Sequence, residues 1–452
     1  GHRKPRCVYV DFLNTGPAVA KCLRTQIVRN AEVTRISGLL ITDVVVEDGV
    51  VVGAVGFNLA DQTPVTIAAK AVIIAAGGLT RLYSRNSASA NMNGDGYAMA
   101  LRAGAELIDM EFPQFFPIGH LAPRLVGMDP IMWDPFRYKL GGRLINAKGE
   151  EFVHEYGGQD EGKYLTTRDI ISYAITKEAE AGRATTSGGV YLSFEHLLEE
   201  ELRSAFGPVI DRLAANDIDL TKRPIEVAPI AHYHMGGIKV NSRMETSVLG
   251  LYASGEAVGG ANGANRLSGN ALVEAFVFGE RAGRFSAIYA TGKQRGWSNK
   301  SGIRHLDSLN NLISCKHGDD GEHAELGQIW AELQNLMWQN VGVLRTGLKL
   351  KKTLLRLRSI RENLEEVTPA KGQAFNLTLQ DWFDLRSGLL TAEAVTLSAL
   401  NRTESRGAHQ REDFTETKQS FERNQSISLD RNGSLNSNFV TTKNVSELEN
   451  AR

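Results

Sequence analysis

The sequence predicts an α/β fold that is interrupted by an inserted α+β domain and followed by a helical bundle. Residues 71–78, "AVIIAAGG", have the pattern of a buried parallel strand that stops at a glycine turn. Residues 250–257, "GLYASGEA", repeat this strand-then-glycine pattern far along the chain. Between them, residues 109–230 are first rich in aromatic residues and proline and then helical. The sheet is therefore expected to be resumed after an insertion.

The composition limits the class of protein. The chain has 452 residues, 42% of them hydrophobic, and a formal net charge of −1. This size suits roughly two to four domains, and the neutral balance argues against nucleic acid as a partner. No apolar run approaches the roughly 20 residues that cross a bilayer. Three scattered cysteines without a CxxC pair indicate a reducing compartment, so we expect a cytoplasmic protein.

The elements of the first part follow in order. Residues 39–57 contain two β-branched runs that meet at "EDG", which predicts a hairpin, and "TPVTIAAKAVIIAAGG" is a second hairpin-like run. In nucleotide-binding sheets, ligands lie at the carboxyl ends of parallel strands such as 71–78. Asp95 then precedes a helix that runs to about Gly104. A helix cap and a contact with a cofactor's phosphates or hydroxyls are both open for Asp95.

The later chain predicts further helices. A helix over residues 166–182 begins at "TTRD", and after residue 320 three runs place apolar side chains at helical spacing, beginning at Leu326, Leu354 and Phe383. The Ser/Asn-rich end of the chain lacks a core pattern. The expected organisation is a nucleotide-binding domain (1–108), a capping domain (109–230), the return of the first domain (231–292), a linker (293–320), a helical domain (321–418) and a flexible tail (419–452).

Several separated motifs then agree on one family. They are "AAGG" (75–78), "NGDG" (93–96), "TTRD" (166–169), "HYHMGGI" (232–238), "SGE" (254–256), "GANRLSGNAL" (263–272) and "ESRGAHQRED" (404–413). From Gly1 to about Phe414 the sequence resembles the flavoprotein subunit of fumarate reductase and succinate dehydrogenase, a family whose relatives include L-aspartate oxidase. The resemblance implies a Rossmann-like FAD domain with a capping domain over the isoalloxazine ring, and FAD as cofactor.

The resemblance also implies which residues contact FAD. The family's N-terminal GxGxxG segment and its flavin-linking histidine have no counterpart here, so we expect a separate N-terminal FAD-binding segment as a partner. The matched cofactor positions are Leu40, Ile41, Gly77, Gly78, Asp95, His232, Tyr233, Glu256, Arg266 and Leu272.

By the same resemblance, the catalytic residues are Arg168, His232 and Arg266. Arg266 would anchor a substrate carboxylate, because its planar guanidinium grips a carboxylate with two parallel hydrogen bonds. Arg168 would move the proton. The alternatives are an Arg266 that satisfies loop carbonyls and an Arg168 that pairs with Asp169 at a helix start. His234 and His232 lack a third ligand, so no metal site is expected.

The sequence departs from the family around the substrate. Residues 114–118 read "QFFPI" where the dicarboxylate enzymes usually have "QFHPT", so Phe116 and Ile118 replace a histidine and a threonine. Trp133 and Asp134 stand where the family has a Thr-Glu pair, and Asn262 replaces a histidine. The machinery for a second carboxylate is largely missing.

The resemblance implies an FAD-dependent oxidoreductase, an electron-transport flavoprotein acting on a CH–CH bond beside a carboxylate or acyl group, and the departures around the substrate predict a substrate other than a standard C4 dicarboxylate. Amino-acid oxidation, as in L-aspartate oxidase, and a non-catalytic flavoprotein subunit or fragment are the alternatives. The partner that the family implies is an iron–sulfur electron-transfer subunit, through which the chain would be associated with a membrane.

Overall fold

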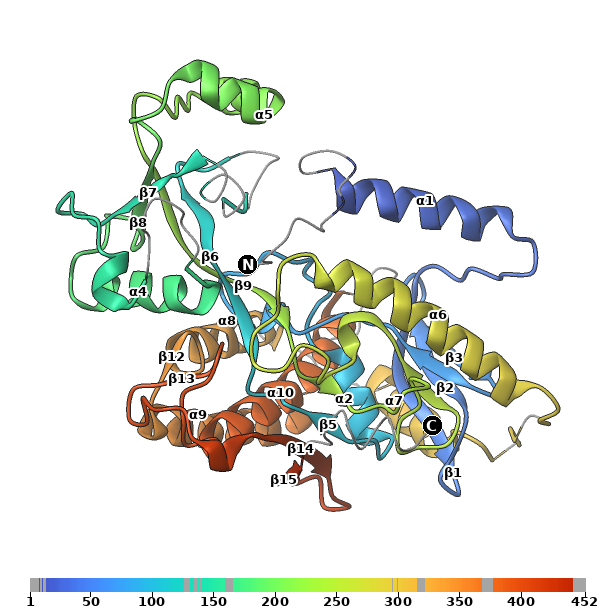
Figure 1. The fold of residues 1–452 in the computed structure, drawn as a ribbon. Helices are drawn as coiled ribbons and strands as arrows, with labels where there is room; N and C mark the ends of the chain where they lie inside the picture. The colour runs from blue at the N-terminus through green and yellow to red at the C-terminus, as the bar shows by residue number, and fades with distance from the viewer. Residues whose placement is uncertain are drawn as a thin grey trace. The chain divides into compact units, whose positions relative to one another are not determined.

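The chain divides into two compact units. The computed structural model describes residues 8, 10, 14–125, 131–133, 137, 140–158, 166–294, 296–298, 300–314, 322–367 and 377–441. Unit 1 comprises Gly1–Leu39, Pro117–Ala228 and Leu267–Gly269, and unit 2 comprises Leu40–Phe116, Pro229–Arg266 and Asn270–Arg452 (Figure 1). Among the described residues, no helix combines the length and the apolar character that a membrane span requires.

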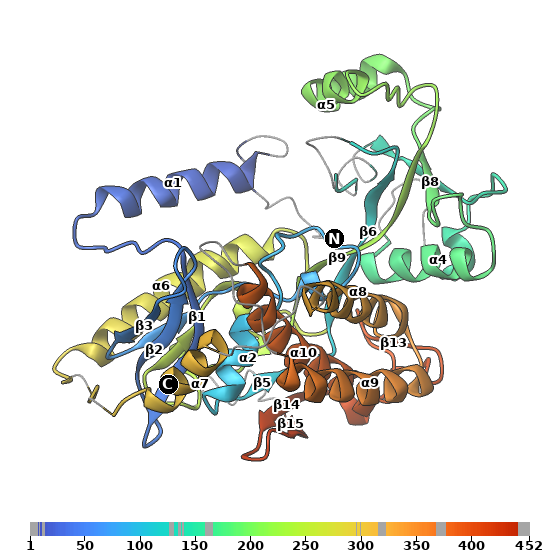
Figure 2. The same ribbon diagram turned by 180° about the vertical axis from the view of Figure 1, so that it is seen from behind.

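A three-stranded sheet opens unit 2, in the order β1 (Leu39–Glu47), β2 (Val50–Asn58) and β3 (Pro64–Ala68). Asp48 and Gly49, which join β1 to β2, both have positive φ angles, of 50° and 76°. That backbone twist suits a two-residue hairpin, as the sequence predicted. Helix α7 (Ile303–Ser314) packs against β2 and β3 (Figure 2).

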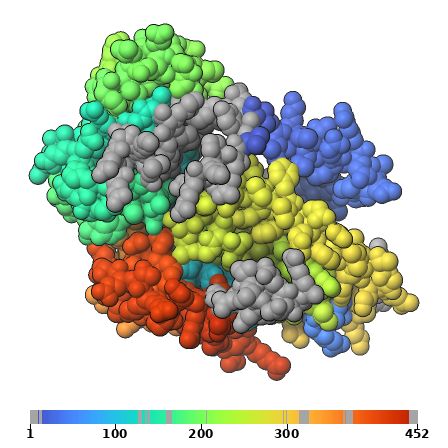
Figure 3. Space-filling view, in the orientation of Figure 1, coloured from blue at the N-terminus to red at the C-terminus, as the bar shows by residue number. Residues whose placement is uncertain are grey.

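The predicted parallel strands pair with each other. Strand β4 (Val72–Ile74) runs parallel to β11 (Leu251–Ala253), with Val72 opposite Leu251. The second hairpin-like run does not form a hairpin, since β3 pairs with β2 and β4 with β11. Helix α6 (Asn270–Ala290) packs on both parallel strands. It forms part of the molecular surface, in yellow in Figure 3, with exposed apolar side chains that include Val273, Phe276 and Val277.

The helical domain also has the predicted kind of structure. Helices α8 (Glu322–Asn340), α9 (Gly347–Glu366) and α10 (Leu377–Asn401) form a bundle, and α10 packs against α8, α9 and α2 (Asp95–Arg102) (Figure 1). Helix α10 is buried on nearly all sides, which explains why its apolar residues outnumber those of a surface helix.

The expected linker over residues 293–320 contains a helix. Helix α7 occupies Ile303–Ser314. Leu309 is 2% exposed, and Leu306 packs against a small cluster of valines from β1 and β2, namely Val45, Val52 and Val55. The apolar period in this segment is short and interrupted by asparagine and serine, so the sequence suggested a loop.

The tail expected to be flexible is ordered as far as residue 441. Strands β14 (Arg423–Leu429) and β15 (Leu435–Thr441) form an antiparallel hairpin, and β14 also pairs with β5 (Leu107–Ile108). Strand β10 (Gly237–Ile238) completes this sheet. The buried positions of β14 include Gln425 and Ser426. This strand is therefore stabilised by polar contacts, which a search for apolar residues misses. Residues 442–452 lie outside the described residues.

Unit 1 is built around a four-stranded sheet. Its order is β6 (Pro113–Ala122), β9 (Ile225–His234), β8 (Val190–Ser193) and β7 (Arg143–Ile145), and its helices α4 (Arg168–Glu180) and α5 (Glu199–Ala214) supply further core residues. The chain passes between the units within β6 and β9.

The remaining elements of the two units are α1 (Thr15–Arg29), η1 (Thr80–Leu82), η2 (Val153–Tyr156), η3 (Gly255–Ala257), β12 (Leu344–Arg345), β13 (Gln410–Arg411) and η4 (Gln419–Phe421).

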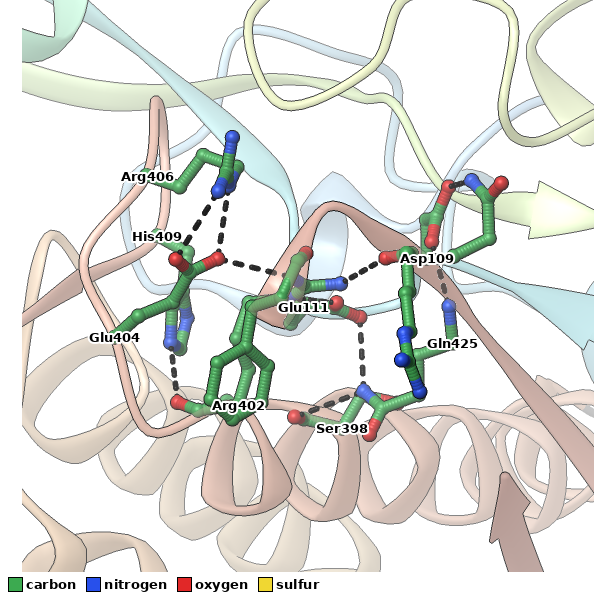
Figure 4. A network of polar contacts seen from close by, with 12 residues as sticks. Asp109, Glu111, Ser398, Arg402, Glu404, Arg406, His409 and Gln425 are labelled. Atoms are coloured by element: carbon green, nitrogen blue, oxygen red, sulfur yellow. Dashed lines mark hydrogen bonds and ion pairs between the residues drawn. The ribbon is translucent and has the colours of Figure 1, made fainter. Parts of the chain in front are cut away.

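A buried ion network joins distant parts of unit 2. Arg402 Nε donates to Glu111 Oε1 at 2.5 Å, and Arg402 also contacts Glu404 Oε1 at 3.0 Å (Figure 4). Arg406 donates to both carboxylate oxygens of Glu404. The side chains of Glu111 and Arg402 are 0% and 1% exposed. Removing one partner of such a pair typically costs about 3–5 kcal/mol, because the other charge stays buried.

Asp109 extends this network to the C-terminal hairpin. Its Oδ1 accepts the Gln425 backbone N–H at 2.9 Å, and Gln425 Nε2 donates to Glu111 Oε2 at 3.1 Å (Figure 4). Burial, and then the nearby Glu111 carboxylate, raise the pKa of Asp109 to about 7.

We expect the effect of Asp109→Asn on stability to be more favourable at pH 8 than at pH 5. An unfolded aspartate ionises near pH 3.9. The folded carboxyl ionises near pH 7, so the folded state holds the extra proton between these values. Stability therefore falls as pH rises from about 4 to about 7, and the asparagine removes this loss. Asparagine also tolerates the positive φ of 56° at this position. Thermal unfolding midpoints at both pH values measure the difference.

Asp430→Asn is the matched control. Backbone donors, Ser434 first, lower the pKa of Asp430, so this carboxyl is ionised in both states from pH 5 to pH 8. Its substitution should shift the midpoint equally at both pH values. A difference for Asp109→Asn that does not grow with pH would contradict a protonated Asp109.

Candidate active site

The carboxyl ends of β4 and β11 form a strand-end site made of Gly77, Gly78, Asp95 and Glu256. Gly78 lies so close to Glu256 that a Cβ there would approach Oε1 at 2.3 Å. Gly77 has a φ of 76°, which favours glycine. Gly94 is the N-cap of α2 and donates its N–H to the Gly78 carbonyl at 3.2 Å. Asp95 is therefore the first helical residue rather than the cap.

Glu256 is one of two carboxyl groups at this site. Its Oε1 accepts the His234 backbone N–H at 3.0 Å. Burial raises the pKa of Glu256 to about 7, while the His234 N–H and the Arg266 guanidinium oppose the shift. Arg266 lies over the ring of Tyr233, the residue before His234 on β9, so its cation is near Glu256.

The residues at the strand-end site fit FAD. The small residues Ala75 and Ala76 are exposed beyond the end of β4, and the glycines bring the backbone within reach of a ligand. Ligands of open α/β sheets bind at this end of parallel strands. Leu272, in the first turn of α6, is 38% exposed, and Leu40 and Ile41 are partly buried in β1.

Residues 263–266 form a loop that is held from two sides. Gln114 Nε2 donates to the Arg266 carbonyl at 2.9 Å and to Asn265 Oδ1 at 3.0 Å. From the other side, the Ala408 N–H donates to the Ala264 carbonyl at 2.9 Å. A Cβ on Gly407 would lie 2.3 Å from that carbonyl, so the close approach requires glycine. The C-terminal signature "ESRGAHQRED" thus supports the loop that carries Arg266.

The Arg266 side chain is 5% exposed and lies over the ring of Tyr233, with its Cζ 4.2 Å from the ring centroid. His232 is partly buried on the same strand, β9. Its Nδ1 lies 2.8 Å from Ser87 Oγ, and the Phe116 ring packs edge-on against its imidazole at 5.2 Å between centroids. The structure therefore brings together Arg266, Tyr233 and Glu256, and packs Phe116 on His232.

His234 is a core residue. It is fully buried, with Nε2 3.1 Å from the Met110 carbonyl and Nδ1 3.3 Å from the Tyr97 hydroxyl. Burial lowers the pKa of His234 to about 4, so the ring is neutral at physiological pH. Within the described ranges, no group of three or more His, Cys, Asp or Glu side chains has a geometry that could hold a metal ion.

The other predicted site residues lie in unit 1. Arg168 is the first residue of α4, after the N-cap Thr167, and is partly buried. Ile118 and Trp133 are fully buried in the core of unit 1, where Trp133 Nε1 donates to His120 Nδ1 at 3.1 Å. Both residues pack among apolar neighbours in this core. Asp134 lies outside the described residues.

Sequence reasoning missed Glu274. Tyr233 Oη and Asn262 Nδ2 each lie 2.6 Å from an oxygen of its carboxylate. The available signal was a single carboxylate in the otherwise apolar start of α6, "NALVEAFVFG". An ionisable residue in such a stretch, unless it is paired, is costly to bury.

Known proteins resemble the chain over most of its length. The family model "FAD binding domain" matches residues 1–272, and "Fumarate reductase flavoprotein C-term" matches residues 330–449. One chain of the CoM/CoB fumarate reductase of Methanothermobacter marburgensis is 36% identical over 427 residues, which are 94% of this chain and 75% of that protein.

Solved structures agree with these matches. The FrdA chain of an Escherichia coli quinol fumarate reductase variant is similar with a TM-score of 0.85 and 30% identity, covering 96% of this chain and 76% of that one. Sdh1 of Mycobacterium smegmatis is similar with a TM-score of 0.84 and 31% identity, covering 99% and 78%.

The fold, the strand-end site and these matches define an FAD-dependent oxidoreductase. Within that class, the chain belongs to the flavoprotein family of fumarate reductase and succinate dehydrogenase.

We expect Gly78→Ala to lower the FAD content of the purified protein several-fold. The added Cβ would meet Glu256 Oε1 at 2.3 Å and displace the carboxylate that faces the cofactor end of the sheet. The flavin absorbance per protein, measured with the expected N-terminal FAD-binding segment present and compared with that of the unsubstituted chain, measures the loss.

Gly283→Ala on α6 provides the control, because a Cβ there meets no heavy atom within 4 Å. It should keep the full flavin content, since alanine favours a helix over glycine. Unchanged flavin in Gly78→Ala would remove Gly78 and Glu256 from the cofactor site.

Proposed function

We propose that the chain transfers a hydride between FAD and a C–C bond next to a carboxylate or acyl group. One observation carries the proposal. Arg266 is buried over the ring of Tyr233, and the next residue on β9, His234, donates its backbone N–H to Glu256 just after the carboxyl end of β11. A guanidinium, which binds carboxylates with two parallel hydrogen bonds, thus lies close to the end of the sheet where the cofactor fits.

The residues of unit 2 bind and orient the substrate in this proposal. FAD, when bound, supplies a flavin N5 that accepts or donates the hydride. Arg266 grips the carboxylate with its planar fork, and the loop that holds it is fixed by Gln114 and Ala408. Ser87 fixes the ring orientation of His232, whose imidazole would contact the substrate.

Arg168 is the proposed proton carrier. The carbon beside the one that exchanges the hydride must gain or lose a proton, which needs a donor or acceptor close by. Arg168 stands in the "TTRD" motif of the family and begins helix α4, whose Ile171, Ala174 and Ile175 pack in the core of unit 1. A helix start holds the guanidinium stem in a fixed place.

The specificity follows from Phe116. Its ring, 3% exposed, packs on His232 where the dicarboxylate enzymes have a second histidine. Burying an unpaired carboxylate against an aromatic ring costs several kcal/mol, because its hydration is lost without new hydrogen bonds. An apolar group gains about 25 cal/mol per Å² of buried area. The proposed substrate is therefore an enoate, or the saturated acid, with one carboxylate or thioester and a largely apolar remainder.

An iron–sulfur subunit is the proposed electron partner. The three cysteines, at positions 7, 22 and 315, are spaced over most of the chain and do not have the spacing of a cluster motif. Several similar proteins carry the name "fumarate reductase flavoprotein subunit", which describes one component of a larger enzyme. Association with a membrane would occur through such a partner.

Arg168→Lys should lower kcat by roughly 10²–10⁴-fold, the usual contribution of general acid–base catalysis, and leave the flavin content unchanged. Lysine keeps the charge but not the geometry of the guanidinium. Turnover of a monocarboxylate with a redox dye, measured on the FAD-loaded protein, gives the rate. Arg203→Lys, at an exposed ion pair on α5, should keep normal turnover. A near-normal rate in Arg168→Lys would assign the proton transfer to another residue.

A panel of acids should show higher kcat/KM for cinnamate-like and branched monocarboxylates than for fumarate or succinate. The reason is the apolar Phe116 beside His232. The same dye assay, run with reduced and oxidised dye, covers both directions. L-Aspartate belongs in the panel, because its oxidation would indicate amino-acid oxidase activity. If fumarate or succinate were preferred over all others, the predicted specificity would be wrong, although the reaction class would stand.

A further inference from the structure

A buried carboxylate accepts a hydrogen bond from the hydroxyl of Tyr233, the aromatic neighbour of the Arg266 side chain. Glu274, in the first turns of α6, is 9% exposed. Tyr233 Oη donates to its Oε2 at 2.6 Å, and Asn262 Nδ2 donates to its Oε1 at 2.6 Å. Both carboxylate oxygens are thus occupied by short hydrogen bonds, which are stronger than neutral ones because the acceptor is charged.

The hydrogen bond from the Tyr233 hydroxyl to Glu274 changes the electron density of the tyrosine ring over which Arg266 lies. Arg266 Cζ stands 4.2 Å from the Tyr233 ring centroid, a distance typical of a cation–π contact. Burial, and then the Glu274 carboxylate, keep the pKa of Tyr233 well above its ordinary value, so the phenol stays a proton donor. A phenol that donates to a carboxylate has a more electron-rich ring, which attracts the guanidinium more strongly.

Asn262 completes the arrangement. Its amide is neutral and donates one hydrogen bond, so it holds the carboxylate without cancelling its charge. It belongs to the same short segment as Arg266, four residues earlier, so the loop and α6 are tied together at Glu274.

We propose that Glu274 is a positioning residue for Arg266, acting through Tyr233. Its carboxylate, held by Asn262, fixes the tyrosine ring at the place where the ring supports the guanidinium, and strengthens that contact. This inference rests on the proposed role of Arg266 in binding a carboxylate. Glu274 itself does not contact the substrate.

The test measures how well Arg266 is held, without any ligand. Phenylglyoxal modifies accessible guanidinium groups, and peptide mass spectrometry follows the rate at Arg266 in the purified holoprotein. In Glu274→Gln the rate should rise roughly tenfold, the factor expected when a desolvated cation–π contact is weakened. Tyr233→Phe keeps the ring but removes the hydroxyl, and should give a similar rise.

A double-mutant cycle separates positioning from a general loosening of the fold. If Glu274 acts through Tyr233, the double variant should be labelled at Arg266 no faster than either single variant. The labelling rate at the exposed Arg203 should stay constant in all of them, and thermal unfolding reports their folding. If Glu274→Gln does not fold, Tyr233→Phe still tests the hydroxyl–carboxylate contact.

An unchanged rate of phenylglyoxal labelling at Arg266 in the folded variants would overturn the inference. It would also be overturned if the two single substitutions acted independently, so that their effects on the logarithm of the rate added up in the double variant. The affinity for cinnamate and for neutral cinnamamide, measured by calorimetry, distinguishes this outcome from a failure of the proposed function. Glu274→Gln should weaken cinnamate roughly tenfold and leave cinnamamide unchanged. If Arg266→Gln binds cinnamate as tightly as the unsubstituted protein, the proposed anchor is wrong, whereas faster labelling in Glu274→Gln would still support the positioning role.

Discussion

The ion pair of Glu111 and Arg402 is the contact on which much of unit 2 depends. Both side chains are almost completely buried, and the charges lie 2.5 Å apart. A buried charge without its partner is strongly unfavourable, so neither residue is stable in this core alone. Glu111 leads into β6, and Arg402 follows α10, so satisfying the pair fixes the helical bundle against the strand that carries Gln114 and Phe116.

This constraint reaches the candidate active site through the backbone. Within residues 404–413, Glu404 accepts a hydrogen bond from Arg402. Gly407 and Ala408, a few residues later, pack against Ala264. Gln114, three residues after Glu111, holds the other side of the same loop. The position of Arg266 is therefore set by contacts among three segments that are distant in the sequence. A buried polar network of this kind specifies one arrangement when all its members are satisfied.

The sequence was most informative where a local pattern has a local cause. The hairpin turn at Asp48 and Gly49, the parallel strands and the bundle helices could be predicted because backbone conformation and apolar spacing decide them. The β14 strand could not, since two of its three buried residues are the polar Gln425 and Ser426, whose partners lie 316 and 320 residues earlier. The motif that contains Arg266 is a continuous stretch of sequence and could be recognised directly. The role of Glu274 depends on Tyr233 and Asn262, which only the fold brings near it.

The long separation within the ion pair also sets the order in which the chain can fold during synthesis. Glu111 leaves the ribosome 291 residues before Arg402. At roughly 5–20 residues per second, this is a delay of about 15–60 s. The core of unit 1 uses only residues between 118 and 227, so it can form early in that interval. The acidic turn at Asp109 and Glu111 must therefore stay hydrated until Arg402 has been synthesised.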